Sequence, residues 1–320
     1  MKAHVDARAN SRRGLLLILI AALLWGTVGV ATKAIYNLAD TNALSIGFFR
    51  LAIATPALLV ACWRTLGRRA FRVAPRDLAL MLLIGATVAL YQVCYFAAIP
   101  RVGVAVAVLV TLCTAPVMVA LLAAALLGER LTAVVVLALA GALAGAVMLA
   151  WAEPGAVGTR RDTVTGILLA LGAALGYAAI TLCSRALAGR YHPLQPITAG
   201  FGAGAIMLLP FALANGMVVT YPLAGWALLL HLGLVPTALA YVLFLAGMRH
   251  TPATVASIVT LVEPLTATAL AWVLFGERLG PLGLLGAALL LGGIGLLYRG
   301  AVWPARVAPT ERARPDLDVI

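Results

Sequence analysis

The sequence predicts an all-α integral membrane protein with ten transmembrane helices, arranged as two inverted five-helix repeats. Three observations lead to this fold class. Hydrophobic residues make up 63% of the 320 residues and charged residues only 11%, which leaves too little polar surface for a water-soluble globule. The apolar residues gather in runs of about twenty, the length that crosses a hydrocarbon core of about 30 Å. The second half of the chain also repeats the pattern of the first.

Apolar runs between charged or Pro/Gly-rich breaks give the individual helices. The first run follows basic residues and looks like a signal peptide at its start, but it continues to Ile35 and is therefore expected to be a retained helix. The expected spans, in chain order, are 14–35, 43–63, 77–98, 102–127, 132–151, 163–188, 194–214, 223–247, 252–275 and 280–298.

The distribution of Lys and Arg over the loops predicts the orientation. Most of the 23 basic residues fall in loops on the same side as the N-terminus, so both termini are expected in the cytoplasm, with the chain crossing the inner (cytoplasmic) membrane of the cell. The predicted organisation is a cytoplasmic tail 1–13, a first repeat 14–151, an extracytoplasmic linker 152–162, a second repeat 163–298 and a disordered cytoplasmic tail 299–320.

The repeat is clearest around two copies of the tetrapeptide GERL. Pro116 and Pro264 precede Glu129 and Glu277 by the same 13 positions, within "TAPVMVALLAAALLGERL" and "VEPLTATALAWVLFGERL". An odd number of helices per repeat places the second copy upside down in the membrane, the arrangement of many alternating-access transporters. Glu277 is expected at a helix end, with Arg278 or a nearby helix terminus as its partner.

The chain resembles the drug/metabolite transporter superfamily in its ten helices, its "FFR" at residues 48–50 and its two proline-then-GER segments. Within that superfamily it is similar to EamA-type exporters, close to those for aromatic amino acids and methyl viologen. The resemblance covers about residues 14–298. It implies a bundle with a central cavity between the halves, which opens alternately to each side without a metal or an organic cofactor.

Glu263 is the first candidate for the functional site, because it falls near the middle of an expected membrane helix. An acid at that depth costs about 2.5–3.5 kcal/mol and should face a cavity or a partner. It could carry protons or bind a cationic substrate group, or it could form a structural ion pair with Arg50. Arg50 in turn could pair with Glu263, reach the outer interface, or hold a substrate carboxylate.

Aromatic and polar side chains in other expected helices complete the candidate site, because such groups bind amino acids and cationic drugs. Each of them could instead pack between helices or lie at the membrane interface. The candidate substrate-binding residues are Trp25, Tyr91, Gln92, Tyr95, Tyr177, Tyr241 and Glu263, and helix kinks are expected at Pro116, Pro236 and Pro264.

Several function classes fit the sequence poorly. The net charge of +12 lies in short loops, which argues against a nucleic acid partner, and the scattered Cys and His residues give no metal-site spacing. No nucleotide-binding or hydrolase motif is visible, so an enzyme is not expected. The predicted function is a secondary transporter that exports amino acids, aromatic ones included, or related metabolites. The alternatives are a channel or facilitator and a drug or cation efflux carrier. The expected partners are a small-molecule substrate and the lipid bilayer, with a monomer as the simplest assembly.

Overall fold

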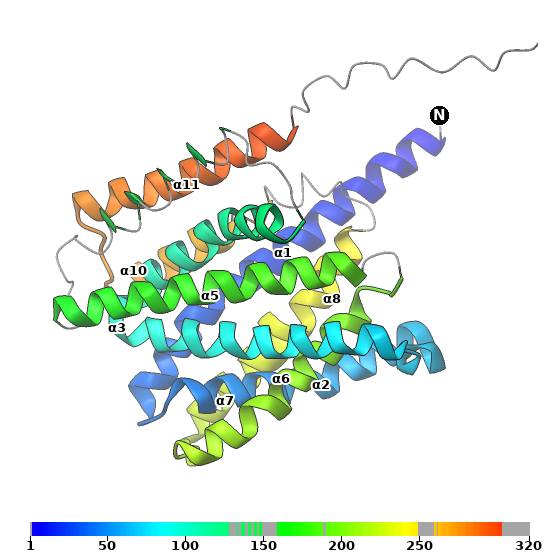
Figure 1. Ribbon diagram of the computed structural model, residues 1–320, viewed down its shortest axis with the longest axis horizontal. Helices are drawn as coiled ribbons and strands as arrows, with labels where there is room; N and C mark the ends of the chain where they lie inside the picture. The colour runs from blue at the N-terminus through cyan, green and yellow to red at the C-terminus, as the bar shows by residue number, and fades with distance from the viewer. Residues whose placement is uncertain are drawn as a thin grey trace, which may run out of the picture.

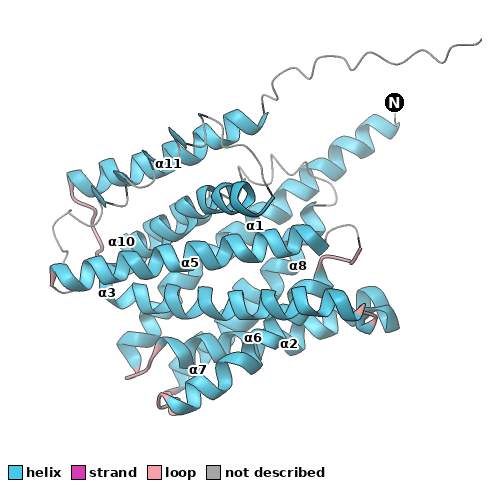
Figure 2. Ribbon diagram, viewed as in Figure 1, coloured by secondary structure: helices cyan, strands magenta, loops and turns pink. Residues whose placement is uncertain are grey.

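The computed structural model describes residues 2–127, 159–187, 190–248, 259–260 and 262–302, with scattered residues between 133 and 148. Over these residues the chain is a bundle of helices joined by short loops, without a β-strand (Figure 2). The all-α fold class is therefore confirmed. The helices are α1 (Lys2–Leu38), α2 (Ala43–Leu66), the 3₁₀-helix η1 (Gly67–Phe71), α3 (Pro75–Leu127), α5 (Arg160–Leu187), α6 (Leu194–Ala214), α7 (Leu223–Gly233), the π-helix η2 (Leu234–Leu239), α8 (Ala240–Met248), α10 (Val262–Phe275) and α11 (Pro281–Val302).

Six helical stretches in the described part of the chain are long and apolar enough to cross a membrane, and α10 and the first part of α11 are shorter apolar helices. One of the six is formed by α7, η2 and α8 together, over Leu223–Met248. The expected helix 132–151 is described only at scattered residues, and the start of the expected helix 252–275 lies outside the described residues, as do most of the linker 152–162 and the C-terminal tail. At the other end, α1 begins at Lys2, so helix also covers most of the expected N-terminal tail.

Helix α3 joins two of the expected helices through a break at Gly103. A straight helix of its 53 residues would be about 80 Å long, more than twice the thickness of a hydrocarbon core. Gly103 has φ 78° and ψ 169°, a backbone conformation that residues with a Cβ rarely adopt, and the chain runs back beyond this point (Figure 1). The break at Gly103 lies close to the expected one between the helices 77–98 and 102–127, and the kink expected at Pro116 stays a prediction.

Pairs of small residues let α5 and α6 approach α3 closely. A Cβ added to Gly204 would lie 3.0 Å from the carbonyl oxygen of Gly85, and one added to Gly176 would lie 3.1 Å from the backbone nitrogen of Tyr91. Such small-residue contacts are the usual way in which membrane helices pack, because lipid gives them little hydrophobic drive to associate. The contact at Gly176 places Tyr177 beside Tyr91, where the candidate site is found.

Candidate functional site

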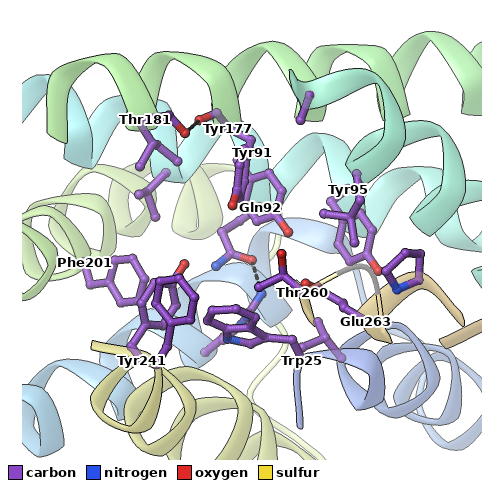
Figure 3. A pocket seen from close by; sticks show the side chains of 18 of the residues that line it. Trp25, Tyr91, Gln92, Tyr95, Tyr177, Thr181, Phe201, Tyr241, Thr260 and Glu263 are labelled. Carbon is purple, nitrogen blue, oxygen red and sulfur yellow. Dashed lines mark hydrogen bonds between the residues drawn. The ribbon is translucent and has the colours of Figure 1, made fainter. Parts of the chain in front are cut away.

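A cavity of about 480 Å³ lies inside the bundle and takes its walls from both halves of the sequence. Its volume is in the range of sites that hold small organic ligands, about 300–1,000 Å³. Helices α1, α2, α3, α5, α6, α8 and α10 all contribute side chains, and Figure 3 shows them converging on one space. The lining residues include Trp25, Arg50, Tyr91, Gln92, Tyr95, Tyr177, Thr181, Phe201, Tyr241, Phe244, Thr260, Glu263 and Pro264.

All seven candidate substrate-binding residues line this cavity, and so do Arg50 and Pro264. Their contact with a substrate stays a prediction, but the structure brings them to one place. The other two prolines at which kinks are expected, Pro236 and Pro116, lie on η2 and on α3. Pro236 is buried within the π-helix η2, and Pro116 follows the lining residue Ala115 along α3.

The aromatic side chains form two walls. In the first wall, Trp25 of α1 contacts Tyr241 and Phe244 of α8, with ring centroids 5.3 and 5.2 Å apart. In the second wall, Tyr91 stacks on Tyr95 with the ring planes 6° apart and the centroids at 5.8 Å. Aromatic faces of this kind suit apolar rings and organic cations.

Two more rings extend these walls. The ring of Phe201 in α6 meets that of Tyr241 edge to face, with the ring centroids 5.3 Å apart. The ring centroid of Tyr177 in α5 lies 6.1 Å from that of Tyr91. Tyr241 and Phe244 belong to the second half of the sequence, while Tyr91 and Tyr95 belong to the first. A ligand between the walls would therefore contact both halves.

Arg50 reaches the cavity from α2 although its side chain is nearly inaccessible, with 5% of the residue exposed. Its Nε donates to the hydroxyl of Thr237 at 2.8 Å, and its Nη1 donates to the side-chain oxygen of Gln92 at 2.9 Å. The guanidinium also lies 5.7 Å from the centre of the Phe96 ring. A buried cation needs such partners, because removing it from water is costly.

Thr237 was not among the candidate residues. It lies in the π-helix η2, and its hydroxyl donates to the carbonyl oxygen of Leu232, five residues earlier, at 2.7 Å. Single π turns inside α-helices often occur at functional sites. The feature of the sequence that could have pointed to Thr237 is the preceding residue, Pro236. It cannot donate a backbone hydrogen bond and so favours a local change of helix type.

Glu263 lines the cavity from the start of the described part of α10, at a place where α1 packs closely. A Cβ on Gly26 would lie 2.7 Å from the Cβ of Thr266 and 3.1 Å from the carbonyl oxygen of Glu263. Between residues that the structure describes, we find no hydrogen bond or ion pair that ends on the Glu263 carboxylate. The ion pair with Arg50 therefore stays a prediction, although both groups face the same cavity.

Glu277 has different surroundings, in the loop between α10 and α11. Its carboxylate accepts hydrogen bonds of 3.0 Å from the backbone N–H groups of Val104 and Ala105, which begin the second part of α3 after the break at Gly103. Lys33 donates to the same carboxylate at 2.6 Å, with its own side chain 21% exposed and that of Glu277 15% exposed. We call these residues the Glu277 cluster.

The Glu277 cluster confirms the expectation that this acid interacts with a helix terminus. The cationic partner of Glu277 is Lys33 from α1, which was not among the alternatives expected from the sequence. The equivalent acid of the first repeat, Glu129, lies outside the described residues. Among the residues described, no group of three or more His, Cys, Asp or Glu side chains is placed to hold a metal ion.

Comparison with known proteins identifies the family. The model of the EamA-like transporter family matches residues 12–151 and again residues 164–299. A solved structure, described only as "Crystal structure of protein", superposes with a TM-score of 0.63 over 89% of this chain and 95% of that one, at 23% identity, which shows a shared fold.

Three curated relatives carry transporter names. The chain is 34% identical over 93% of its length to the uncharacterized transporter YwfM of Bacillus subtilis, of which 97% is covered. It is 31% identical over 93% of its length to a probable terminal-alkyne amino-acid exporter of Streptantibioticus cattleyicolor, again with 97% covered. It is 28% identical over 88% of its length to the pseudopaline exporter CntI of Pseudomonas aeruginosa, with 94% covered. The chain therefore belongs to the EamA-like transporter family and is a multi-pass membrane transporter, not an enzyme.

Proposed function

We propose that this chain is a secondary carrier that exports amino acids, aromatic ones included, or related metabolites across the cytoplasmic membrane by alternating access. The observation that carries the proposal is the cavity, which has aromatic walls from both halves of the chain and holds one cationic and one acidic side chain, Arg50 and Glu263. The name of the relative from Streptantibioticus cattleyicolor, an amino-acid exporter, supports the same substrate class.

The proposed architecture is two inverted five-helix repeats with both termini in the cytoplasm. Two separate matches to the family model support a repeat, and so does the break at Gly103, which separates two of the expected helices. Rocking of one repeat against the other would then expose a cavity between them to each side in turn. The proposed partners are a small-molecule substrate and the surrounding lipid bilayer, with one chain as the transport unit and no nucleic acid.

A drug or cation efflux carrier is the second candidate, and the aromatic walls favour it. Trp25, Tyr91 and Tyr241 offer ring faces to an organic cation, and Glu263 would supply the compensating negative charge. Arg50 opposes it, because a fixed guanidinium in the same cavity repels a cargo that has no acidic group. A channel would need a continuous polar path through the bundle, whereas the lining here is mostly aromatic and aliphatic.

Uptake into proteoliposomes tests these functions against each other. Purified protein is reconstituted, and labelled phenylalanine is compared with labelled methyl viologen as the organic cation, with protein-free liposomes as the background. Saturable uptake of phenylalanine is the expected result. Uptake of methyl viologen alone would overturn the amino acid assignment in favour of cation efflux, and single-channel currents in planar bilayers would overturn the carrier mechanism.

A further inference from the structure

We infer that Thr237, together with Gln92, orients the Arg50 guanidinium as a receptor for the carboxylate group of the cargo. This inference rests on the proposed function, since it names the chemistry by which that cavity selects its substrate. Thr237 is a positioning residue in this arrangement, because it acts through Arg50. The cargo class that follows is a small zwitterion with an aromatic or apolar side chain.

Arg50 carries a buried positive charge. Thr237 and Gln92, which accept hydrogen bonds from Arg50, are neutral groups, and the neighbouring Tyr91 hydroxyl, which also interacts with the guanidinium, is not an anionic partner either. A guanidinium has five N–H donors, and these two bonds use two of them. Within the described part of the chain, no carboxylate lies within ion-pair distance of Arg50. The buried positive charge is thus solvated but not neutralised, and an anion that entered the cavity would find donors still available.

The orientation of the guanidinium depends on the Thr237 hydroxyl. Because the Thr237 hydroxyl hydrogen is committed to the Leu232 carbonyl at 2.7 Å, the oxygen must act as the acceptor towards Arg50. The carbonyl of Leu232 is an acceptor five residues away only because the helix takes a π turn here. The π turn thus fixes the position of the Thr237 hydroxyl and directs its hydrogen to Leu232, which leaves its oxygen as the acceptor for Arg50.

Packing of the neighbouring helices supports this contact. Helix α7 lies so close to α2 that a Cβ on Gly233 would be 2.6 Å from the Ile53 side chain and 3.2 Å from the Arg50 carbonyl oxygen. Phe96 of α3 lies 5.7 Å from the guanidinium carbon, measured to the ring centre. Arg50 is therefore held by α2, by η2 and by α3, which favours a fixed receptor over a freely moving side chain.

Other side chains of the cavity match the rest of the cargo. Glu263 lines the same cavity from α10 and offers a negative group to an ammonium, while the walls around Trp25 and Tyr91 suit an aromatic or apolar side chain. An amino acid matches all three features. Phenethylamine lacks the carboxylate that Arg50 would bind, and 3-phenylpropionate lacks the ammonium that Glu263 would bind.

The test compares Thr237→Val and Thr237→Ser with the wild type in proteoliposome uptake of labelled phenylalanine, with unlabelled phenethylamine and 3-phenylpropionate as competitors. Val matches the shape of Thr but cannot accept the Arg50 hydrogen bond, so the KM for phenylalanine should rise by about tenfold or more, the size of a lost bond to a charged group. The Vmax should change little, and Ser should restore the KM. Phenethylamine should compete poorly with the wild type, and its relative potency should increase in Thr237→Val.

The matched control is Thr32→Val. Thr32 is a fully buried threonine of α1 whose hydroxyl donates to the backbone carbonyl of Val28 in its own helix, and it is not among the residues that line the cavity. Its KM should equal that of the wild type. The unfolding temperature of each purified variant, with and without phenylalanine, reports folding and binding separately from transport.

The outcomes separate the two proposals. If the wild type binds and transports phenylalanine but Thr237→Val keeps the same KM and the same preference over phenethylamine, the inference is overturned and the proposed function stands. If phenylalanine and the other amino acids neither raise the unfolding temperature of the wild type nor are transported by it, the proposed function fails and the inference fails with it.

Discussion

Two glutamates on one segment of this chain, Glu263 and Glu277, show how partners decide the role of an acid in a membrane protein. Glu277 has a lysine and two backbone N–H groups around its carboxylate, which together satisfy its charge at the break in α3. Glu263 lines the central cavity, and no described residue donates a hydrogen bond to its carboxylate. The first acid is thus placed to hold helices together, and the second is placed to interact with something that enters.

Among variants that only remove a charge, Glu263→Gln should have the largest effect. Removal of the negative charge should lower the uptake of phenylalanine by about tenfold or more, because a charged hydrogen-bond partner contributes about 1.5–3 kcal/mol. The unfolding temperature should stay close to that of the wild type, since no described contact depends on the charge. Unchanged uptake in a folded variant would reduce Glu263 to a structural role and remove the contrast with Glu277.

A charge exchange sharpens the same contrast. If Arg50 and Glu263 pair during transport, then Arg50→Glu and Glu263→Arg should each abolish uptake, and the double variant should recover part of it. Uptake and folded yield are measured for all three variants. A double variant as inactive as either single one would show that each residue depends on its own surroundings, such as Thr237 and Gln92 for Arg50.

Glu277→Gln, the same substitution at the other glutamate, should lower the stability of the folded protein and leave substrate binding unchanged. The Lys33–Glu277 pair is partly exposed, so its loss should cost about 2 kcal/mol, between the values for surface and for buried pairs. The unfolding temperature should fall by several degrees, while the KM for phenylalanine should be unchanged in the protein that remains folded. Glu263→Gln is the matched control, and equal unfolding temperatures for the two variants would contradict the distinction.

A smaller effect is expected from Gly103→Ala, at the break that the Glu277 cluster stabilises. A Cβ at this position would meet a φ of 78° and would lie 3.0 Å from the carboxyl group of Glu277. The expected loss of stability is about 1–2 kcal/mol, within the range for a residue other than glycine in a backbone region that only glycine adopts readily. Gly280→Ala is the control, because Gly280 has open space around it and no positive φ. Equal unfolding temperatures for the two variants would be evidence against strain at the break.

The smallest effect should follow from Trp25→Leu in the first aromatic wall. Leucine keeps an apolar surface but removes the ring contacts to Tyr241 and Phe244. Because Trp25 lines the cavity, the variant would also lose an aromatic pair with the substrate ring, which contributes about 0.5–1.5 kcal/mol beyond buried area, so the KM for phenylalanine should rise by about two- to tenfold. The KM for leucine should change less. An equal rise for both amino acids would indicate a general disturbance of α1.

Much of the candidate site could be predicted from the sequence, because a polar or charged residue in the middle of an apolar helix has few alternatives to a cavity. Arg50, Gln92 and Glu263 were identified in this way, and the aromatic residues near them on expected helices followed. The all-α membrane class needed only composition and run length. The number of helices and their inversion depend on a repeat whose first GERL segment lies outside the described residues.

The parts that the sequence could not supply depend on contacts between distant segments. Thr237 looks like an ordinary helical threonine until a π turn directs its hydroxyl to both Leu232 and Arg50. Lys33 and Glu277 lie 244 positions apart, and only the packed bundle pairs them. The spans 77–98 and 102–127 predict a break close to Gly103, but they do not single out this residue, because a positive φ depends on local geometry and not on residue type alone.

The most direct test of the central claim, that the cavity holds the cargo, is substrate protection of a single cysteine at Thr181. This residue lines the cavity from α5, and the four native cysteines, Cys62, Cys94, Cys113 and Cys183, would first be replaced by alanine. The rate of labelling by a small water-soluble thiol reagent is measured with and without saturating phenylalanine. Thr159→Cys, at the exposed start of α5, serves as the control. Our account predicts slower labelling at position 181 and no change at position 159. Equal labelling rates at position 181, under conditions where phenylalanine is transported, would contradict it.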